Sequence, residues 1–472
     1  MTVALRPYQE SAIDGLRQSI ARGHRSPLLV SPTGSGKTVI FSYLTSQLVS
    51  RGKRVAILNH REELTEQISR ALNLANVRHG IIAAGMQYDR NPLAHVASVF
   101  TLARRMATTL VPDYVVIDES HHCIAGSTWG KVIESWRIEN PGLKVIGVTA
   151  TPERLSGEGL GQVFDDMVMG PTTASLIDAG FLSPYKLFAP PVAQQADLSG
   201  VHTKMGEFVR GEVAAAMDKP AIIGSAVSHY RKHCNGAPAV AFCASVVHAE
   251  HVAEQFRSEG FRAASIDGKM EKPTRRAIVR DFGAGQLNVM TSCDLVSEGF
   301  DVPGMVGAIL LRPTQSLALY LQQVGRALRI CGGKSHAVLL DHVGNSARHG
   351  LPDDEREWSL DGRDKKAKAD RDPDDVAIKQ CKACFAISRA TATVCRECGK
   401  PFVVVARKVE EKEGELEEVD PAVARAEFMR SRAAADDLES LAQVGRLRGM
   451  KNPEGWARHV LQAREEKQRK RA

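Results

Sequence analysis

Apolar residues along the first 350 positions alternate between short continuous runs and longer stretches with helical spacing. Between 28 and 150 the runs LLV, RVAIL, YVVID and KVIGVTA are separated by stretches such as REELTEQISRAL. A second series reads AVAFCAS, AASIDG, LNVMTS, GAILLR and HAVLLDH, with stretches such as HAEHVAEQFRSEG between them. Short buried strands that alternate with amphipathic helices are typical of parallel sheets covered by helices. The pattern therefore predicts two α/β lobes.

Breaks in this pattern predict the domain boundaries. PYKLFAPPVAQQADLSG carries three prolines and no clear period, so we place the interlobe connection near 185 to 200. The helix-like stretch that follows, to about 235, is expected to pack on the second lobe. PDDEREWSLDGRDKKAKADRDPDD is too charged to form a core and predicts an exposed linker. The predicted parts are a first lobe at 1–185, a second lobe at 186–350, a charged linker at 351–378, a four-cysteine module at 379–402, and a charged segment with a small helical tail at 403–472.

Composition is that of a globular protein. The 472 residues are too many for one compact core, and 43% hydrophobic with 25% charged residues is an ordinary balance. The net charge of +7 favours an anionic partner only weakly, because it is spread over the whole length. The N-terminus lacks the pattern of a signal peptide, and no run of 18 apolar residues occurs, so we expect a cytosolic protein without membrane contact.

The segment SPTGSGKT at 31–38 follows an apolar run and precedes helical spacing, which is the strand, loop, helix order of a phosphate cradle. The backbone N–H groups that can converge on a β-phosphate are those of Gly34, Ser35, Gly36, Lys37 and Thr38. Lys37 can reach the β- and γ-phosphates, and Thr38 can ligate Mg²⁺. Ser31 stands where the strict pattern has its first glycine. A glycine-rich turn with a chance lysine is the alternative, which the strand and helix context disfavours.

Two further segments bear on the same chemistry. VVIDESHH sets Asp118 and Glu119 at the end of an apolar strand, where open α/β sheets bind ligands. Asp118 would hold Mg²⁺ through water, and Glu119 would orient and deprotonate an attacking water; a solvated turn is the alternative. In LRPYQESAIDGL, Gln9 lies just before a predicted helix and could pair with the edge of adenine. An ordinary exposed glutamine is the alternative there. Together the segments predict an ATP site.

Four of the nine cysteines form two C-x2-C pairs, separated by ten residues: Cys381, Cys384, Cys395 and Cys398. Four thiolates with this pairing suit a tetrahedral structural Zn²⁺ site, which would supply much of the folding free energy of so small a module. Two disulfides are the alternative, disfavoured in a reducing cytosol. Further on, helical spacing around Trp456 and a basic end predict either a small module that could touch nucleic acid or a frayed, solvated tail.

Seven segments follow one another in the order RPYQ, SPTGSGKT, LNHREELTEQ, DESHH, TATPERL, TSCDLVSEGFDVP and QQVGRALR. Over roughly 1–400 the chain resembles superfamily 2 (DEAD/DEAH-like) helicases, and in segment order the RadD-type DNA-repair helicase-like proteins of bacteria and phages. The resemblance implies two RecA-like lobes with ATP between them. It implies that the second lobe completes the site with Gln322, Arg326 and Arg329, of which Arg326 or Arg329 acts as the arginine finger.

The same resemblance implies roles for two further segments. Gly299 and Asp301 in SEGFDVP would lie across the interlobe cleft and contribute to the nucleotide site. TAT at 149–151 would couple hydrolysis to lobe movement; a helix cap is the alternative.

A nucleic-acid strand should cross both lobes on the rim opposite ATP. Its candidate contacts are His60, Arg61, Glu63, Thr101, Arg104 and Ser245, each of which could equally be an ordinary surface residue. TAT in place of SAT, and QxxGRxxR in place of HRxGRxxR, argue against an RNA helicase of the DEAD-box type. We therefore expect an ATP-driven motor on single-stranded or branched DNA, in repair, recombination or phage replication, with repair or replication proteins as partners. The alternatives are a DNA-binding accessory protein that uses ATP as a switch, and an RNA helicase.

Overall fold

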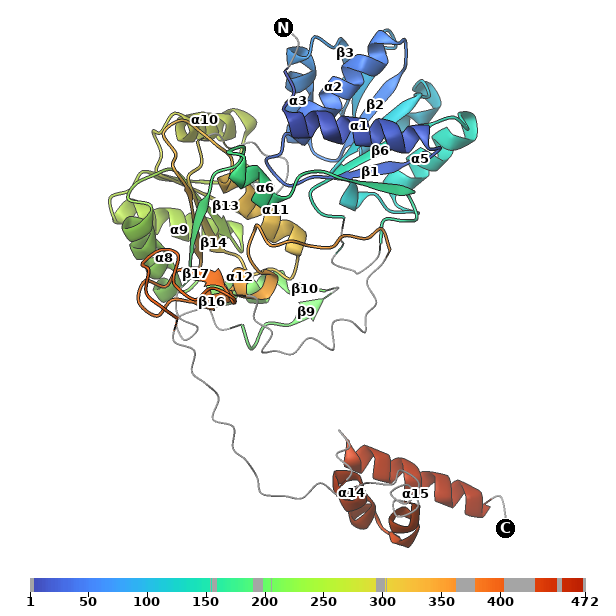
Figure 1. Ribbon diagram of the computed structural model, residues 1–472, viewed down its shortest axis with the longest axis vertical. Coiled ribbons are helices and arrows are strands. Elements are labelled where there is room, and N and C mark those ends of the chain that lie inside the picture. The colour runs from blue at the N-terminus through green and yellow to red at the C-terminus, as the bar shows by residue number, and fades with distance from the viewer. Residues whose placement is uncertain are drawn as a thin grey trace. The chain divides into compact units, whose positions relative to one another are not determined.

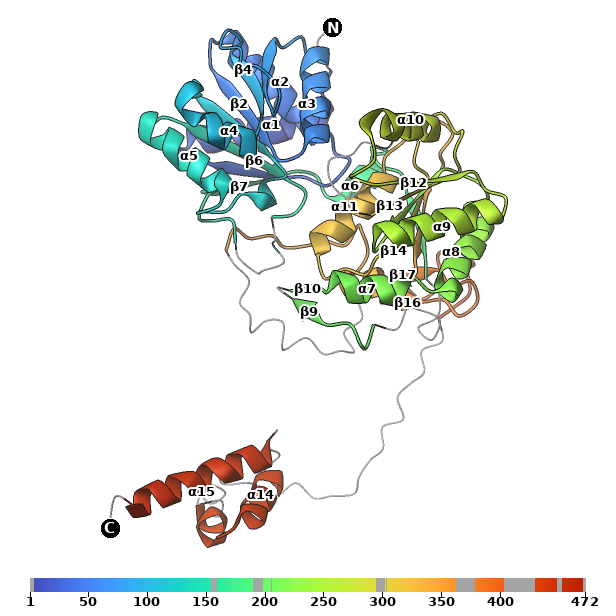
Figure 2. The same cartoon turned by 180° about the vertical axis from the view of Figure 1, so that it is seen from behind.

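The computed structural model describes residues 4–152, 154, 159–189, 198–204, 206–293, 302, 304–361, 378–402, 429–447 and 452–469. The chain forms two compact units, Met1–Phe402 and Val403–Ala472. The first unit contains two parallel sheets with helices on their faces, shown from opposite sides in Figures 1 and 2. This confirms the predicted fold class of two α/β lobes.

The first lobe is built on a seven-stranded sheet in the order β3-β4-β2-β5-β6-β1-β7, with all neighbouring strands parallel. Its strands are β1 (Pro27–Val30), β2 (Val55–Asn59), β3 (His79–Ile82), β4 (Ala94–Ser98), β5 (Tyr114–Asp118), β6 (Lys144–Thr149) and β7 (Asp166–Met169). Its helices are α1 (Pro7–Ala21), α2 (Lys37–Ser50), α3 (Glu62–Leu74), α4 (Val99–Arg105), η1 (Met106–Thr108), η2 (Ser120–His122) and α5 (Thr128–Glu139).

Alternating side chains of the buried strands face opposite sides of this sheet. On β5, Val116 packs with residues of α1, α2 and α3, whereas Val115 and Ile117 pack with residues of α4 and α5. Both faces are therefore covered, which explains why the strand YVVID reads as a continuous apolar run and not as an alternating one.

The second lobe has a six-stranded parallel sheet in the order β12-β13-β11-β14-β15-β8. Its strands are β8 (Tyr185–Phe188), β11 (Ala239–Cys243), β12 (Ala263–Ile266), β13 (Val289–Ser292), β14 (Gly307–Leu311) and β15 (Ala337–Asp341). Its helices are α7 (Arg210–Met217), α8 (Pro220–His233), α9 (Val246–Ser258), α10 (Lys272–Gly283), α11 (Leu317–Ala327) and α12 (Asn345–His349), and a short hairpin pairs β9 (Thr203–Lys204) with β10 (Glu207–Phe208). The helices α7 and α8 confirm the helical stretch expected before 235.

The connection between the lobes lies earlier than the range 185 to 200 predicted from the prolines. Tyr185–Phe188 is a strand of the second sheet, paired with β15, whereas β7 closes the first sheet. The chain therefore crosses between residues 170 and 184, a segment that contains α6 (Thr173–Asp178). Pro184 directly precedes this edge strand, whereas Pro190 and Pro191 lie outside the described residues.

The predicted linker at 351–378 is also only partly a linker. Within its described part, Trp358 and Leu360 pack against the core of the first lobe, and the Leu360 carbonyl accepts a hydrogen bond from Gly161 N at 2.9 Å. After leaving the second lobe, the chain thus returns to the first. Trp358 and Leu360 thus give this charged stretch apolar contacts with the first lobe, although the stretch as a whole is too polar to form a core.

The four-cysteine module forms a two-stranded antiparallel sheet, β16 (Ile378–Gln380) and β17 (Ile387–Arg389). It packs on β8, the edge strand of the second sheet (Figure 1). Ala189 N donates to the Phe385 carbonyl at 3.4 Å, and the Lys186 ammonium lies 2.8 Å from the Glu397 carboxylate. The module therefore covers an edge that would otherwise expose unpaired backbone groups.

The second unit contains a pair of helices, α14 (Leu438–Leu447) and α15 (Pro453–Arg469). Leu441 and Ala442 of α14 pack with Ala457 and Val460 of α15, and Trp456 lies beside this small core. The predicted helical tail is therefore a packed helical hairpin. In the parts of the chain that the structure describes, none of the helices combines the length and the apolar character needed to cross a bilayer.

Candidate functional site

The glycine-rich loop lies between β1 and α2, at the carboxyl edge of the first sheet. Gly34 and Gly36 have φ angles of +89° and +81°, which L residues with side chains rarely adopt. Space is also lacking, because a Cβ at Gly36 would lie 2.5 Å from Gln9 Nε2. The Ser31 hydroxyl donates to Ser35 Oγ at 2.7 Å. The serine that replaces the usual first glycine therefore links the two sides of the loop by a hydrogen bond.

Lys37 begins α2, and its ammonium folds back over the loop. Its Nζ donates to the carbonyls of Ser31 and Pro32 at 3.2 and 3.3 Å. Burial lowers the pKa of Lys37, and the nearby carboxylates of Glu119 and Asp118 oppose that shift. A cation held over a ring of backbone groups is the arrangement that a phosphate chain requires.

Asp118 and Glu119 follow one another at the end of β5. Asp118 is buried, and burial together with the Glu119 charge raises its pKa to about 7, whereas Lys37 acts in the opposite direction. Glu119 has a left-handed backbone with φ of +51°, a strained conformation for a residue with a side chain. Two adjacent carboxyl groups, one buried and one half-buried, are a donor set that suits a divalent cation with oxygen ligands.

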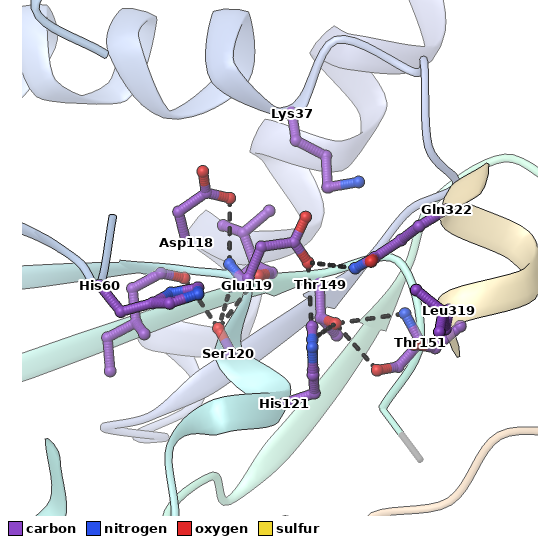
Figure 3. A network of polar contacts seen from close by, with 12 residues as sticks. Lys37, His60, Asp118, Glu119, Ser120, His121, Thr149, Thr151, Leu319 and Gln322 are labelled. Atoms are coloured by element: carbon purple, nitrogen blue, oxygen red, sulfur yellow. Dashed lines mark hydrogen bonds and ion pairs between the residues drawn. The ribbon is translucent and has the colours of Figure 1, made fainter. Parts of the chain in front are cut away.

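A chain of polar contacts runs from this acidic pair into both lobes (Figure 3). Gln322 of α11 donates from Nε2 to Glu119 Oε2 at 3.4 Å. On the other side, His121 Nδ1 lies 3.5 Å from the same carboxylate oxygen and 3.3 Å from Thr149 Oγ1. Thr149 in turn donates to the Thr151 carbonyl at 2.8 Å. The TAT segment is thereby connected to the second lobe through Glu119.

Helix α11 faces the phosphate loop directly. A Cβ at Gly325 would lie 2.6 Å from Thr33 Cβ, so the two backbones can approach only because this residue is glycine. Arg326 is buried, and the charges of both Arg326 and Arg329 act to lower the pKa of Lys37. The structure therefore brings the two predicted arginines to the phosphate loop from the second lobe.

Gln9 is buried and not exposed, which removes the alternative considered for it. Its Oε1 accepts from Arg6 N at 3.0 Å and its Nε2 donates to the Ser35 carbonyl at 3.2 Å. The Tyr8 hydroxyl donates to the same carbonyl at 2.9 Å, and the Tyr8 ring packs edge-on against Phe181. Gln9 thus fastens α1 to the phosphate loop, and its pairing with adenine stays a prediction.

The predicted nucleic-acid contacts lie on several elements. His60 and Arg61 connect β2 to α3, and the His60 ring lies 4.5 Å from that of His122 in the DESHH segment. Ser245 is the N-cap of α9, where its hydroxyl accepts from His248 N at 3.0 Å. Thr101 and Arg104 are on α4, and Arg104 is exposed. Gly299 and Asp301, expected across the cleft, lie outside the described residues.

Glu63, a candidate nucleic-acid contact, is part of an ion-pair row between the lobes. Its carboxylate lies 2.7 Å from the Arg275 guanidinium, with side chains only 24% and 11% exposed. Lys272 pairs with Glu62 and Arg276 with Glu66 beside it, but these two ion pairs are solvent-exposed. Sequence reasoning missed this row because each helix alone looks like a solvated charged face. Opposite charges at matching helical spacing on α3 and α10 were the available signal.

The four cysteine sulfurs lie within 4.8 Å of one another. Cys381 and Cys398 sulfurs are 3.6 Å apart, as are those of Cys384 and Cys395. These distances are far from the roughly 2.05 Å of a disulfide and close to the roughly 3.8 Å expected between sulfurs around tetrahedral zinc. The arrangement therefore fits a closed four-thiolate metal site and not the disulfide alternative.

A phosphate loop in one parallel-sheet lobe, with a second such lobe packed against it, defines a two-lobed enzyme of the RecA-like class that uses ATP. Family models match in agreement with this: residues 2–154 match "Type III restriction enzyme, res subunit", and residues 219–331 match "Helicase conserved C-terminal domain". The matches cover the parts of the two lobes that contain the loop and α11.

Individual proteins are also similar to the chain. A 51.5 kDa protein of Lactococcus phage (isolate 7-9) is 32% identical over 90% of this chain and 89% of its own length. IRC3 of Saccharomyces cerevisiae, named as a candidate ATP-dependent helicase, is 29% identical over 73% of this chain and 52% of its own length. The chain belongs to superfamily 2 of the helicases and is an ATP-hydrolysing enzyme of that type. The RadD-type assignment stays a prediction.

A solved structure shares the fold. The ATP-dependent type ISP restriction-modification enzyme LlaBIII bound to DNA superposes with a TM-score of 0.52 and 17% identity, over 72% of this chain and 28% of that one. The chain therefore corresponds to about a quarter of that enzyme, and the likeness at this identity concerns the fold alone.

Proposed function

We propose that this chain is an ATP-dependent DNA translocase or helicase, in which hydrolysis between the two lobes drives movement on DNA or its remodelling. The observation that carries the proposal is the contact between Gln322 and Glu119. The carboxylate that would activate water touches an amide of the other lobe, so a change in its surroundings during hydrolysis also changes the interlobe contact.

In this proposal the residues have separate tasks. Lys37 leaves the carbonyls of its own loop and binds the β- and γ-phosphates, while Glu119 accepts a proton from the attacking water. Arg326 or Arg329 stabilises the charge that develops on the transferring phosphoryl group. A change in the position of Glu119 during hydrolysis is transmitted through its contacts with His121 and Thr149 to Thr151. Thr151 lies at the start of the segment that leaves the first sheet.

Thr38 and Asp118 are the residues that would hold Mg²⁺, which neutralises phosphate charge when bound. The raised pKa of Asp118 fits this role, because a buried carboxyl with too little positive charge nearby is stabilised by a cation. The four cysteines would hold Zn²⁺ in a structural role, since a set of four thiolates leaves no position for water.

DNA is the proposed substrate, for two reasons. The QxxGRxxR and TAT segments differ from those of DEAD-box RNA helicases, and LlaBIII, which shares the fold, is described as bound to DNA. One relative comes from a Lactococcus phage, and we propose a role in phage replication, recombination or repair. His60, Arg61, Thr101, Arg104 and Ser245 are proposed to contact the strand.

The decisive experiment measures ATP turnover by the purified chain with single-stranded DNA, duplex DNA, branched DNA and RNA of equal length. We expect stimulation of several-fold by single-stranded or branched DNA, and its loss in Lys37→Ala. Stronger stimulation by RNA would support the RNA helicase instead. DNA binding that responds to ATP, with turnover unchanged by any nucleic acid, would support the switch.

A further inference from the structure

Helix α11 ends between Arg326 and Arg329. The helix closes at Ala327, and Arg329 lies two residues beyond it. The last carbonyls of a helix have no partner within the helix, and their dipoles concentrate negative charge there. The position of Arg329 therefore depends on whatever binds these carbonyls from outside.

Lys334 binds them. Its ammonium donates to the carbonyl of Arg329 at 2.8 Å, to that of Met305 at 3.0 Å, and to that of Ala327. The chain returns to this point through a turn in which Lys334 N donates to the Cys331 carbonyl at 3.3 Å and Gly333 has a φ of +77°. One side chain thus bridges the end of α11 and the segment that enters β14.

A residue of the interlobe segment, Ser183, also binds carbonyls at this helix end. Ser183 N donates to the Leu328 carbonyl at 2.7 Å, and Ser183 Oγ to the Arg329 carbonyl at 3.4 Å. The preceding residue, Leu182, approaches the phosphate loop, because a Cβ on Gly34 would lie 2.9 Å from Leu182 Cδ2. The end of α11 is therefore fixed relative to both the second sheet and the loop.

We propose that Lys334 is a positioning residue for the arginines, which sets the end of α11 so that Arg326 and Arg329 face the transferring phosphoryl group. The inference rests on the function proposed above. Arg329 is already close to the loop, since a Cβ on Gly34 would lie 3.5 Å from Arg329 Cγ. Displacing a reacting group by about 1 Å can cost about 10²-fold in rate.

The burial of this lysine needs its carbonyl partners. Lys334 is half-buried, and burial lowers the pKa of its ammonium to about 8, a shift that the neighbouring Cys331 thiolate would oppose. An ammonium removed from water is favourable only where several oxygens replace its hydration. Three carbonyls, two of them at a helix C-terminus, supply this replacement.

The test compares binding of ADP with binding of ADP plus aluminium fluoride, an analogue of the transferring phosphoryl group. Lys334→Met removes every donor, Lys334→Gln keeps two without charge, and Lys334→Arg keeps both charge and donors. Lys131→Met, at an exposed lysine of α5, is the matched control. We expect Lys334→Met to bind the analogue about 10-fold or more weakly, ADP to bind within about twofold of wild type, and Lys334→Arg to stay within about threefold.

Unchanged analogue binding in folded Lys334→Met would overturn the proposal, as would equal losses of ADP and analogue binding. If Lys334→Met does not fold, Lys334→Gln against Lys334→Arg decides: the proposal requires weaker analogue binding in the former. Failure of the proposed function would look different, as wild-type protein that binds nucleotides but shows no turnover stimulated by DNA.

Discussion

Gln322 Nε2 and Glu119 Oε2 lie 3.4 Å apart, on α11 of the second lobe and at the end of β5 in the first. At this length the hydrogen bond is weak, and a small closure of the lobes would shorten it. The same carboxylate also lies beside His121. Glu119 is therefore the point at which the nucleotide site, the TAT segment and the second lobe meet.

Replacing Glu119 with glutamine should slow turnover strongly while nucleotide binding remains. The amide oxygen can still accept from Gln322, but an amide cannot take a proton from water. General-base catalysis contributes about 10² to 10⁴-fold, so kcat should fall by that order. Steady-state turnover and equilibrium binding of a nucleotide analogue provide the two measurements. A Glu119→Gln chain that hydrolyses ATP at the wild-type rate would assign the base elsewhere.

The variants Arg326→Ala and Arg329→Ala should show which of the two residues acts as the arginine finger. The one that acts as the arginine finger should lose about 10³-fold or more in kcat. Arg280→Ala is a suitable control, because Arg280 lies on α10 and its side chain is 75% exposed. Turnover with saturating DNA is the measurement. If both alanine variants stay within a few-fold of wild type, neither residue stabilises the transferring phosphoryl group.

Metal analysis should find one zinc per chain, and Cys398→Ser should lower this content. The loss should also destabilise the second lobe, because the module covers β8 through the contact between Ala189 and Phe385 and the ion pair of Lys186 with Glu397. Thermal unfolding with and without a strong chelator measures the effect. A reduced, folded chain that contains no zinc would rule out the metal site, and an unchanged unfolding temperature would show that the module is only loosely attached.

The second lobe should lose stability in mild acid. Burial lowers the pKa of His342 to about 3 and that of His248 to about 4, below the usual value near 6.5. Below pH 6.5 both histidines become protonated in the unfolded chain but stay neutral in the folded chain. The free energy of unfolding therefore falls as pH falls. Each histidine contributes about 1.4 kcal/mol per pH unit until its folded pKa is reached. Above pH 7 the two histidines add no pH dependence.

His248→Asn tests this prediction directly. His248 Nδ1 accepts from Ala244 N at 3.3 Å, and asparagine can offer an oxygen acceptor without titrating in this range. Urea unfolding measured between pH 7.5 and 5 should show equal slopes for both proteins above pH 7, and below pH 6 a slope for the variant that is smaller by up to about 1.4 kcal/mol per pH unit. An identical slope in both proteins below pH 6 would mean that His248 does not titrate on unfolding.

The sequence by itself determined those features that depend on residues close together along the chain. Two α/β lobes follow from buried apolar runs, the phosphate loop from the glycines of SPTGSGKT, and the pairing of the four cysteines from their spacing. In each case the interacting groups are close along the chain or share one element. Arg326 and Arg329 could be assigned to the ATP site only through the family resemblance, because their spacing predicts a shared helical face but not what that face contacts.

Only the tertiary structure decided how distant segments meet. Tyr185–Phe188 joins the second sheet by pairing with the edge of β15. Trp358 returns to the first lobe because its ring packs against the core there. Glu63 meets Arg275 across 212 positions of sequence. Lys334 is near α11 in sequence, yet its role depends on the Met305 carbonyl brought there by β14. Local sequence patterns do not predict such contacts, because the energy of each contact comes from burial and from partners in another part of the fold.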